Sequence, residues 1–236
     1  TNSYNTAVGY NSGNAVTTGT NLTALGGLAL DANTTGADNV AIGKGALSAN
    51  TTADNNTAVG TSSLLSNTTG ANNTSVGLNS MYANTTGASN TAVGQSALNA
   101  NTTAANNTAM GYHSLLSNTT GTRNVAVGAL ALDANTDGNY NTVSGYNAGT
   151  ANTGGDQNTF LGYYAGAANT TASNNTFVGS SAGEANTTGN LNVSVGNEAL
   201  KTNTVGDRNV AMGYQALTTF NPSSNADTYN TAIGHV

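Results

Sequence analysis

Few residues of this 236-residue chain could do acid–base or nucleophilic chemistry. The chain has two histidines, His113 and His235, and no cysteine. Each histidine lies just after a glycine, among residues that offer no Ser–His–Asp arrangement, and a lone histidine of this kind is more often a surface residue than a base. The absence of cysteine excludes thiolate ligands and a cysteine nucleophile. The sequence therefore predicts that the chain is not an enzyme and needs no cofactor.

The acidic residues give no metal site either. The spacing of Asp133 and Asp137 in "DANTD" could hold Ca²⁺ weakly, but the segment lacks the cluster of carboxylates that calcium sites use. Asp31, Asp38, Asp54, Asp156, Asp207 and Asp227 are scattered singly along the chain. We expect solvated loop charges and no bound metal.

Charge and hydropathy exclude two classes of partner. Only 6% of the residues are charged, four of them Lys or Arg, and the net charge is −6. Four basic residues cannot track a phosphate backbone, so we expect no nucleic acid partner. No stretch approaches eighteen apolar residues, so we expect no insertion of this segment into a membrane.

Tyrosines that follow glycines are the best candidates for ligand contact. An exposed column of tyrosine rings could stack on sugar rings. The alternative is that each ring only covers the chain corner at its glycine. The candidate carbohydrate contacts are Tyr112, Tyr146, Tyr163, Tyr164 and Tyr214.

A unit of seventeen residues positions these side chains. The glycine that closes "NTAVG" recurs every seventeen residues from Gly9 to Gly213, and only the last step, to Gly234, is longer. Such a period is typical of one unit stacked on itself, so we expect a single repeat array over residues 1–236. The array begins and ends inside the repeat, and we expect it to be a piece of a longer protein. The copies begin at residues 5, 22, 39, 56, 73, 90, 107, 124, 141, 158, 175, 192 and 209, with a partial copy at 230.

We number the positions of each copy from 1 to 17, so that Asn56 is position 1 and Gly60 is position 5. The glycines, the Asn/Thr content and the lack of a 3.6-residue period argue against helices. "TAV" predicts one short strand and the segment around Ser63–Leu65 a second, with glycine at the corners. Joining like strands in parallel gives an all-β parallel β-solenoid (β-roll), in which Asn at positions 1 and 12 can form side-chain ladders.

Residue sizes predict what fills the coil. Where position 3 is Phe160 or Phe177, position 9 is Gly166 or Gly183, whereas in most other copies Ala at position 3 accompanies Leu at position 9, as Ala58 does with Leu64. We infer that positions 3 and 9 share one packed space. Position 4 points to the opposite face of the strand and is also apolar in nearly every copy. We expect this second face to pack against identical chains.

At these residues the sequence resembles a known group of repeats. The string "NTAVGxxALxxNTTGxxN" resembles the tandem repeats of phage tail-fibre proteins and bacterial surface adhesins. Its "NTAVG" core, seen as "NVAIG" at 39–43 and "NVAMG" at 209–213, is similar to the "SVAIG" signature in the heads of trimeric autotransporter adhesins. The resemblance implies a homotrimeric, extracellular fibre segment, on a cell surface or a virion, that serves attachment. Cell-surface carbohydrate is the partner that we expect the tyrosines to contact.

The "NTT" strings leave two further possibilities open. They match the N-glycosylation sequon at Asn33, Asn50, Asn67, Asn84, Asn101, Asn118, Asn169 and Asn186. They also place threonines in regular columns, which is the kind of surface that ice-binding solenoids use. An ice-binding β-solenoid with an Asn/Thr array is therefore the alternative function. The sequence identifies no receptor.

Overall fold

The computed structural model describes residues 3–224 and 227–235, and these residues form a parallel β-solenoid with fourteen strands and no helix. The chain divides into two compact units, Thr1–Thr120 and Gly121–Val236. The predicted fold class is confirmed. The first unit holds β1 (Thr6–Val8), β2 (Thr23–Leu25), β3 (Val40–Ile42), β4 (Thr57–Val59), β5 (Thr74–Val76), β6 (Thr91–Val93) and β7 (Thr108–Met110). The second holds β8 (Val125–Val127), β9 (Thr142–Ser144), β10 (Thr159–Leu161), β11 (Thr176–Val178), β12 (Val193–Val195), β13 (Val210–Met212) and β14 (Thr231–Ile233).

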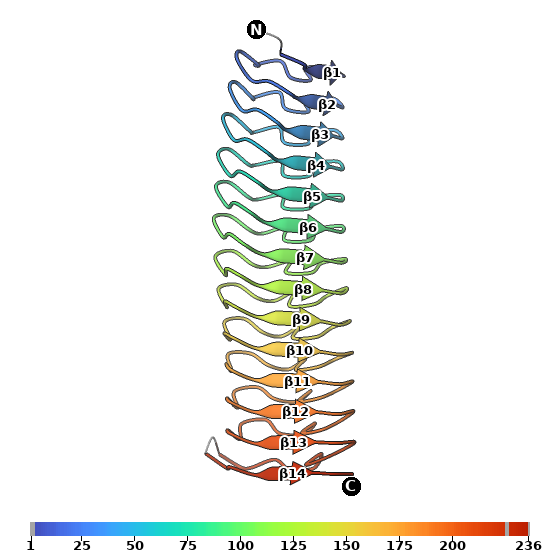
Figure 1. Cartoon of the computed structure of the whole chain (residues 1–236), viewed down its shortest axis with the longest axis vertical. Helices are drawn as coiled ribbons and strands as arrows, with labels where there is room; N and C mark the ends of the chain where they lie inside the picture. The colour runs from blue at the N-terminus through green and yellow to red at the C-terminus, as the bar shows by residue number, and fades with distance from the viewer. Residues whose placement is uncertain (1–2, 225–226, 236) are drawn as a thin grey trace. The chain divides into compact units, whose positions relative to one another are not determined.

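Within each unit every strand pairs with the strand one coil away. β4 pairs with β5 so that Thr57 lies opposite Thr74, and β10 pairs with β11 so that Phe160 lies opposite Phe177. Successive arrows in Figure 1 show this stacking within each unit. Equivalent residues of the repeat therefore form columns, and the seventeen-residue period sets the register of each sheet.

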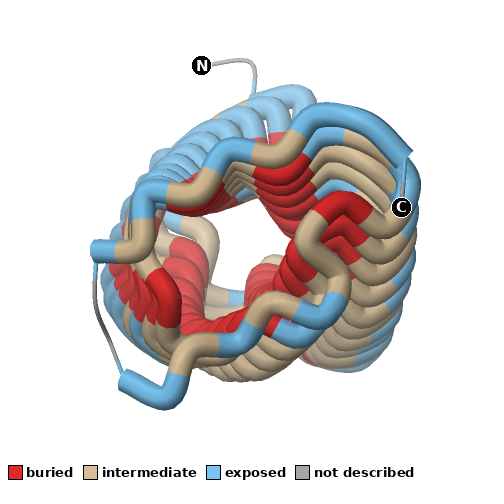
Figure 2. Tube along the Cα trace, turned by 90° about the horizontal axis from the view of Figure 1, so that it is seen from below, coloured by how far each residue is buried: buried red, intermediate tan, exposed pale blue. Residues whose placement is uncertain are grey.

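The middle residue of each strand points into the coil. Ala58 and Phe160 are fully buried, whereas the flanking Thr57 and Val59 are only partly covered. Figure 2 shows the buried residues along the inner side of the coils. Alternation along a strand explains this, because neighbouring side chains project from opposite faces.

The prediction of a second strand around Ser63–Leu65 is wrong. This segment is a chain of turns in which Ser62 and Leu64 adopt left-handed backbone conformations, with φ of 54° and 53°. Positive φ at every second residue reverses the direction of the peptide groups. The Ser62 N–H donates to Lys44 O in the preceding coil, and the Leu64 N–H donates to Ser80 O in the following coil. The segment thus forms hydrogen bonds between coils without an extended backbone.

The glycine at position 5 makes a predicted corner. Gly60 has φ of 131°, and a Cβ atom there would lie 2.5 Å from the carbonyl oxygen of Gly77 in the next coil. Real side chains do not tolerate that approach, and this backbone conformation is open almost only to glycine. The corner therefore explains why the repeat keeps glycine at this position.

Two ladders of buried asparagines run through the coils, as the sequence predicted. At position 12 the Asn84 amide donates to Asn67 Oδ1 at 2.8 Å and to Gly87 O at 3.0 Å. At position 1 the Asn73 N–H donates to Asn56 Oδ1 at 3.0 Å. Among the described residues no buried side-chain nitrogen or oxygen lacks a hydrogen-bond partner. The ladders therefore remove most of the penalty for burying these amides.

The shared space predicted for positions 3 and 9 is confirmed. A Cβ atom on Gly166 would lie 2.9 Å from three ring atoms of Phe160, and one on Gly183 would lie 2.6 Å from the ring of Phe177. In most of the coils with Ala at position 3, Leu64 and its equivalents occupy this space and are fully buried. Most coils thus hold one large side chain, from position 3 or from position 9, and the first copy, with Ala7 and Gly13, is an exception.

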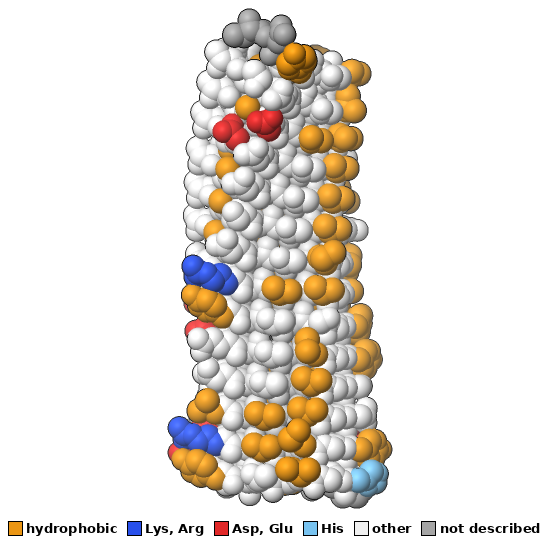
Figure 3. Space-filling model, viewed as in Figure 1, with side chains coloured by type: hydrophobic (Ala, Val, Ile, Leu, Met, Phe, Trp, Pro, Cys, Tyr) orange, Lys and Arg blue, Asp and Glu red, His pale blue; other side chains and the backbone are white. Residues whose placement is uncertain are grey.

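The outer face of each sheet carries position 4 and position 2. Position 4 is aliphatic in almost every coil, and its side chains remain partly exposed, as for Ile42, Met110, Val127, Leu161 and Met212. Figure 3 shows the resulting stripe of hydrophobic side chains on the strand face. The predicted second apolar face is present in both units, and Ser144 interrupts it in the second.

Candidate functional site

The predicted tyrosine contacts lie on the outside of the coils, at the corner after position 5. In the first unit Tyr112 stacks on His113, with ring centroids 3.8 Å apart and planes 13° apart. In the second unit Tyr214 stacks on His235, with centroids 5.0 Å apart. Both tyrosines are nearly half exposed. Each therefore forms a small separate aromatic patch.

Tyr146, Tyr163 and Tyr164 form one cluster in the second unit. The rings of Tyr146 and Tyr163 stack 5.7 Å apart, because position 6 repeats from one coil to the next. The Tyr164 ring is tilted by 55° against Tyr163, at 4.5 Å, and lies 6.0 Å from Tyr146. The structure thus brings three of the five predicted residues together, and Tyr163 is 55% exposed.

The hydroxyl group of Tyr163 stays protonated at neutral pH. Desolvation raises the pKa of Tyr163, and repulsion and a hydrogen bond involving Tyr164 raise that pKa further. A protonated phenol both donates and accepts hydrogen bonds. The cluster can therefore offer flat apolar faces with polar tips to a ligand.

A cluster of charged side chains lies close to these tyrosines. Lys201 Nζ contacts Glu198 Oε1 at 2.7 Å and Glu184 Oε2 at 3.8 Å. Gln215 donates to the second oxygen of Glu198 at 2.7 Å. The hydrogen bond from Lys201 lowers the pKa of Glu198, and the same bond raises the pKa of Lys201. The group is therefore a fixed ion-pair network that carries two negative charges and one positive charge.

Our sequence interpretation missed this network. Glu184 and Lys201 both occupy position 10 of neighbouring coils, and Glu198 and Gln215 both occupy position 7. The signal was therefore present, but it appears only when the repeats are written one above another. Opposite charges in one column of a parallel stack are brought together just as cross-strand pairs are.

A shallow trough of about 460 Å³ joins the tyrosines to the charged network. Ala167 at position 10 and Ala168 and Ala185 at position 11 form its floor, because these small side chains leave space that larger residues would fill. Residues on its lining include Tyr164, Ala168, Glu184, Ala185, Lys201 and Thr202. An apolar floor with a few polar groups at its edge is the usual character of a small-ligand site.

The scattered acidic residues are in part structural. Asp156 Oδ1 accepts the N–H of Asn139 at 2.6 Å, and Asp207 Oδ1 accepts the N–H of Asn190 at 2.6 Å. These bonds form a third ladder, at position 16 of the second unit, which the sequence interpretation did not foresee. Asp133 accepts a hydrogen bond from Thr150 at 2.6 Å. In residues 3–224 and 227–235 no three His, Cys, Asp or Glu side chains gather in a way that could hold a metal ion.

The sequon asparagines are not available for modification in the folded chain. All eight are fully buried in the position 12 ladder, as for Asn67 and Asn169. The Asn67 amide nitrogen, to which a glycan would be attached, donates to Asn50 Oδ1 and to Gly70 O. Glycosylation replaces one of the two amide hydrogens, so it would break one of these bonds and place a sugar inside the packed coil.

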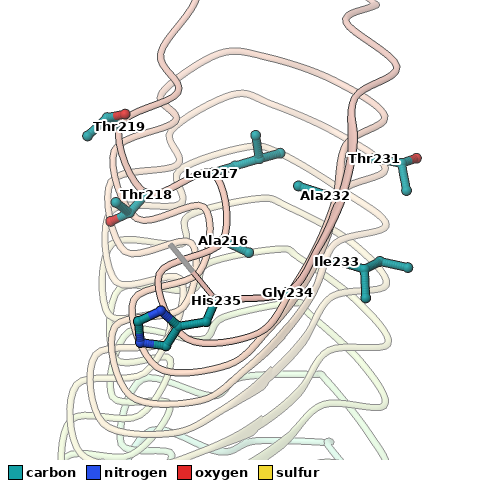
Figure 4. Close-up of a pocket in the computed structure, with 9 residues that line it drawn as sticks. All are labelled: Ala216, Leu217, Thr218, Thr219, Thr231, Ala232, Ile233, Gly234 and His235. Atoms are coloured by element: carbon teal, nitrogen blue, oxygen red, sulfur yellow. The ribbon is translucent and has the colours of Figure 1, made fainter.

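Another hollow lies beside β14 and has a volume of about 560 Å³. Figure 4 shows aliphatic and threonine side chains around it, including Leu217, Thr218 and Ile233, with His235 at its edge. A smaller apolar hollow of about 180 Å³ lies beside β1. His235 is the one titratable residue lining either hollow, so neither presents the paired groups that acid–base catalysis uses.

Comparisons with known proteins give no family for this chain. No family model matches it, and no similar protein was found among the curated proteins or the solved structures. A separate search of the described residues found no helix long and apolar enough to cross a membrane.

Proposed function

We propose that this chain is a structural and adhesive segment of an extracellular fibre, on a phage tail or a cell surface. The segment would hold or form a surface-attachment device. Three side-chain ladders and the backbone hydrogen bonds between coils support this proposal, because they give a stack whose buried polar groups are satisfied along its length. Repeated small-residue packing with few charges suits a rigid spacer better than a catalyst.

The observation that carries the proposal is the apolar outer face of the strands. Burying the residual exposed third of one aliphatic side chain at position 4 contributes roughly 0.5–1 kcal/mol per coil. This contribution repeats in nearly every coil, and identical chains present the same spacing. We propose that three copies bury this face about a common axis, since closed symmetry leaves no apolar face exposed.

The mass of the protein in solution tests this assembly. Light scattering should give a particle of about 70 kDa, three times the chain mass of 23.2 kDa. Val93→Lys places a charge on the proposed interface and should shift the particle towards the monomer. Thr86→Lys, on the exposed position 14 away from the strand, is the matched control and should leave the mass unchanged. A wild-type monomer would contradict the trimer.

One observation favours the alternative of ice binding. In the first unit position 14 is an exposed threonine in every coil, at Thr18, Thr35, Thr52, Thr69, Thr86, Thr103 and Thr120. The neighbouring threonines at position 13 weaken the case for ice binding, because their hydroxyls already donate hydrogen bonds within the protein. Thr68 Oγ1, for example, donates to Thr85 O at 3.0 Å. The row at position 13 is therefore less suited to bind ice than the row at position 14. Shaping of ice crystals by a monomeric chain, lost in Thr69→Lys, would favour this alternative over the fibre.

A further inference from the structure

The trough beside Tyr164 combines three features that occur together at no other described hollow: an aromatic rim, a floor of small residues and an ion-pair network. Ala168 and Ala185 lie in one column on the floor. Tyr164 stands at one end, steadied by its contacts with Tyr146 and Tyr163. The aromatic surface is thus held in place before any ligand arrives, which reduces the entropy lost on binding.

The charges of the trough decide which ligand it suits. Lys201 is neutralised by Glu198 at 2.7 Å and faces the second carboxylate, of Glu184, at 3.8 Å. The three groups together carry a net charge of −1. An anionic ligand would therefore meet repulsion and would have to compete with two carboxylates for Lys201. A neutral ligand with many hydroxyls meets no such penalty.

We propose that this trough binds a neutral hexopyranose unit of a glycan and discriminates against acidic sugars. The C–H face of the sugar packs on Tyr164 and the alanine floor, and its hydroxyls bond to Glu184 and Lys201 at the edge. Aromatic contact with an apolar face and a polar rim is the interaction for which tyrosine is suited. This inference rests on the adhesive part of the proposed function and names the chemical class that the fibre would contact.

Binding of defined oligosaccharides to the full chain tests the proposal. The probes are the neutral maltohexaose, cellohexaose and mannohexaose, and the acidic hexamer of galacturonate, measured by isothermal titration calorimetry. At least one neutral probe should bind, and more tightly than the galacturonate. Tyr164→Ala should weaken that binding at least about tenfold, which corresponds to roughly 1.4 kcal/mol. Tyr10→Ala, an exposed tyrosine of the first coil, is the matched control and should change nothing.

Glu184→Lys provides a second test that does not depend on removing the aromatic ring. It changes the local net charge from −1 to +1, and a unit charge pair at 4 Å in water is worth about 1 kcal/mol. The ratio of galacturonate to neutral-sugar affinity should therefore rise about tenfold or more. Thermal unfolding of each variant should match the wild type, which shows that the fold is intact.

Three results would overturn the proposal: no binding of any neutral probe, neutral binding that survives Tyr164→Ala, or a preference of the wild type for galacturonate that Tyr164→Ala abolishes. None of these affects the particle mass. A trimer that binds no sugar would leave the fibre proposal standing and remove this one. A monomer that binds neutral sugar would do the reverse.

Discussion

Coils 56–72 and 158–174 fill the same internal space with different residues. In the first, Ala58 at position 3 leaves space that Leu64 at position 9 fills. In the second, Phe160 fills it from position 3, and Gly166 leaves space at position 9. The Phe160 ring stacks on Phe177 of the next coil at 5.2 Å. The fold therefore specifies the volume inside a coil and leaves open which position supplies the large side chain.

The outer surfaces of the two units differ more than their interiors. The first unit presents a regular column of exposed threonines, and position 16 is mostly alanine or threonine there. The second unit has the position 16 ladder, the tyrosine cluster and the Glu184–Lys201–Glu198 network. Uniform interiors with varied surfaces indicate that the coil is a scaffold, and under the proposed function recognition would depend on the side chains that its surface carries.

Removing Phe160 should have the largest effect on stability and tests whether the two coils fill the same internal space. Phe160→Ala deletes a fully buried ring and its stack on Phe177, so unfolding free energy should fall by about 3–5 kcal/mol. Gly166→Leu alone should also destabilise, by roughly 1–3 kcal/mol, because its Cβ would crowd the ring. The double variant recreates the Ala–Leu pair of coil 56–72 and should recover most of the loss. Urea unfolding measures all three, and additive losses would contradict the shared space.

Truncating the position 12 ladder should have the next largest effect, and it should be equal in both units. Asn84→Ala removes the bonds to Asn67 Oδ1 and Gly87 O and leaves Asn67 Oδ1 without its buried donor, so a loss of about 2–3 kcal/mol is expected. Asn169→Ala removes the same bonds, to Asn152 Oδ1 and Ala172 O. Asn14→Ala, at an exposed position, is the control and should be neutral. A clear difference between the two ladder variants in urea unfolding would show that the interiors are not equivalent.

Removing a residue of the position 16 ladder from the second unit, and adding one to the first, tests how much this ladder contributes to stability. Asp156→Ala should cost about 1 kcal/mol, since the Asn139 N–H loses its acceptor. Ala88→Asp places a carboxylate where Asp54 accepts the Ala37 N–H in an earlier coil, at 2.7 Å, and should stabilise the first unit slightly. Guanidinium titrations of both variants check this. Stabilisation by Asp156→Ala would contradict a structural role for the ladder.

The smallest expected effect is the dependence on pH that the Glu198 network of the second unit contributes. Lys201 lowers the pKa of Glu198, so the network stabilises the folded chain above the ordinary carboxyl pKa and loses this contribution as pH falls through the lowered value. The melting temperature of the wild type should exceed that of Glu198→Gln near pH 6, and the gap should close on acidification below about pH 4. Lys44→Gln in the first unit should give no such change. A gap that widens in acid would refute the assignment.

Much of the interior could be predicted from the sequence, because its steric and hydrogen-bonding requirements are met by only a few residue types. The glycine at Gly60 and its equivalents marked the corner, and asparagine at Asn67 and Asn84 marked a ladder. The pairing of Phe160 with Gly166 revealed the shared space, since side-chain volume is visible in the sequence. These features depend on steric and hydrogen-bonding demands that few residues can meet.

The rest could not be predicted, because the residue types involved give no sign of their backbone conformation or of their hydrogen-bond partners. Leucine gives no sign that it will adopt positive φ, yet Leu64 and its equivalents do so, and the second strand was therefore wrong. Left-handed leucine costs energy that only the surrounding stack can offset. Asp156 is identical in type to a solvated loop aspartate, and only the fold gives it a backbone donor. The carbohydrate contacts and the ice-binding alternative stay predictions.

The asparagine ladders give each stack a direction. The backbone hydrogen bonds between coils run in both senses, so their dipoles largely cancel. The hydrogen bonds between the side-chain amides of the position 12 ladder all run in one sense, so their dipoles add. Asn50 donates to Asn33, Asn67 to Asn50 and Asn84 to Asn67, always from the later coil to the earlier one. Bonds aligned in this way polarise one another. During synthesis the earlier coil leaves the ribosome first. An earlier coil, once formed, therefore presents amide oxygens as acceptors for the donors of the coil translated after it, and we expect folding to proceed in that order.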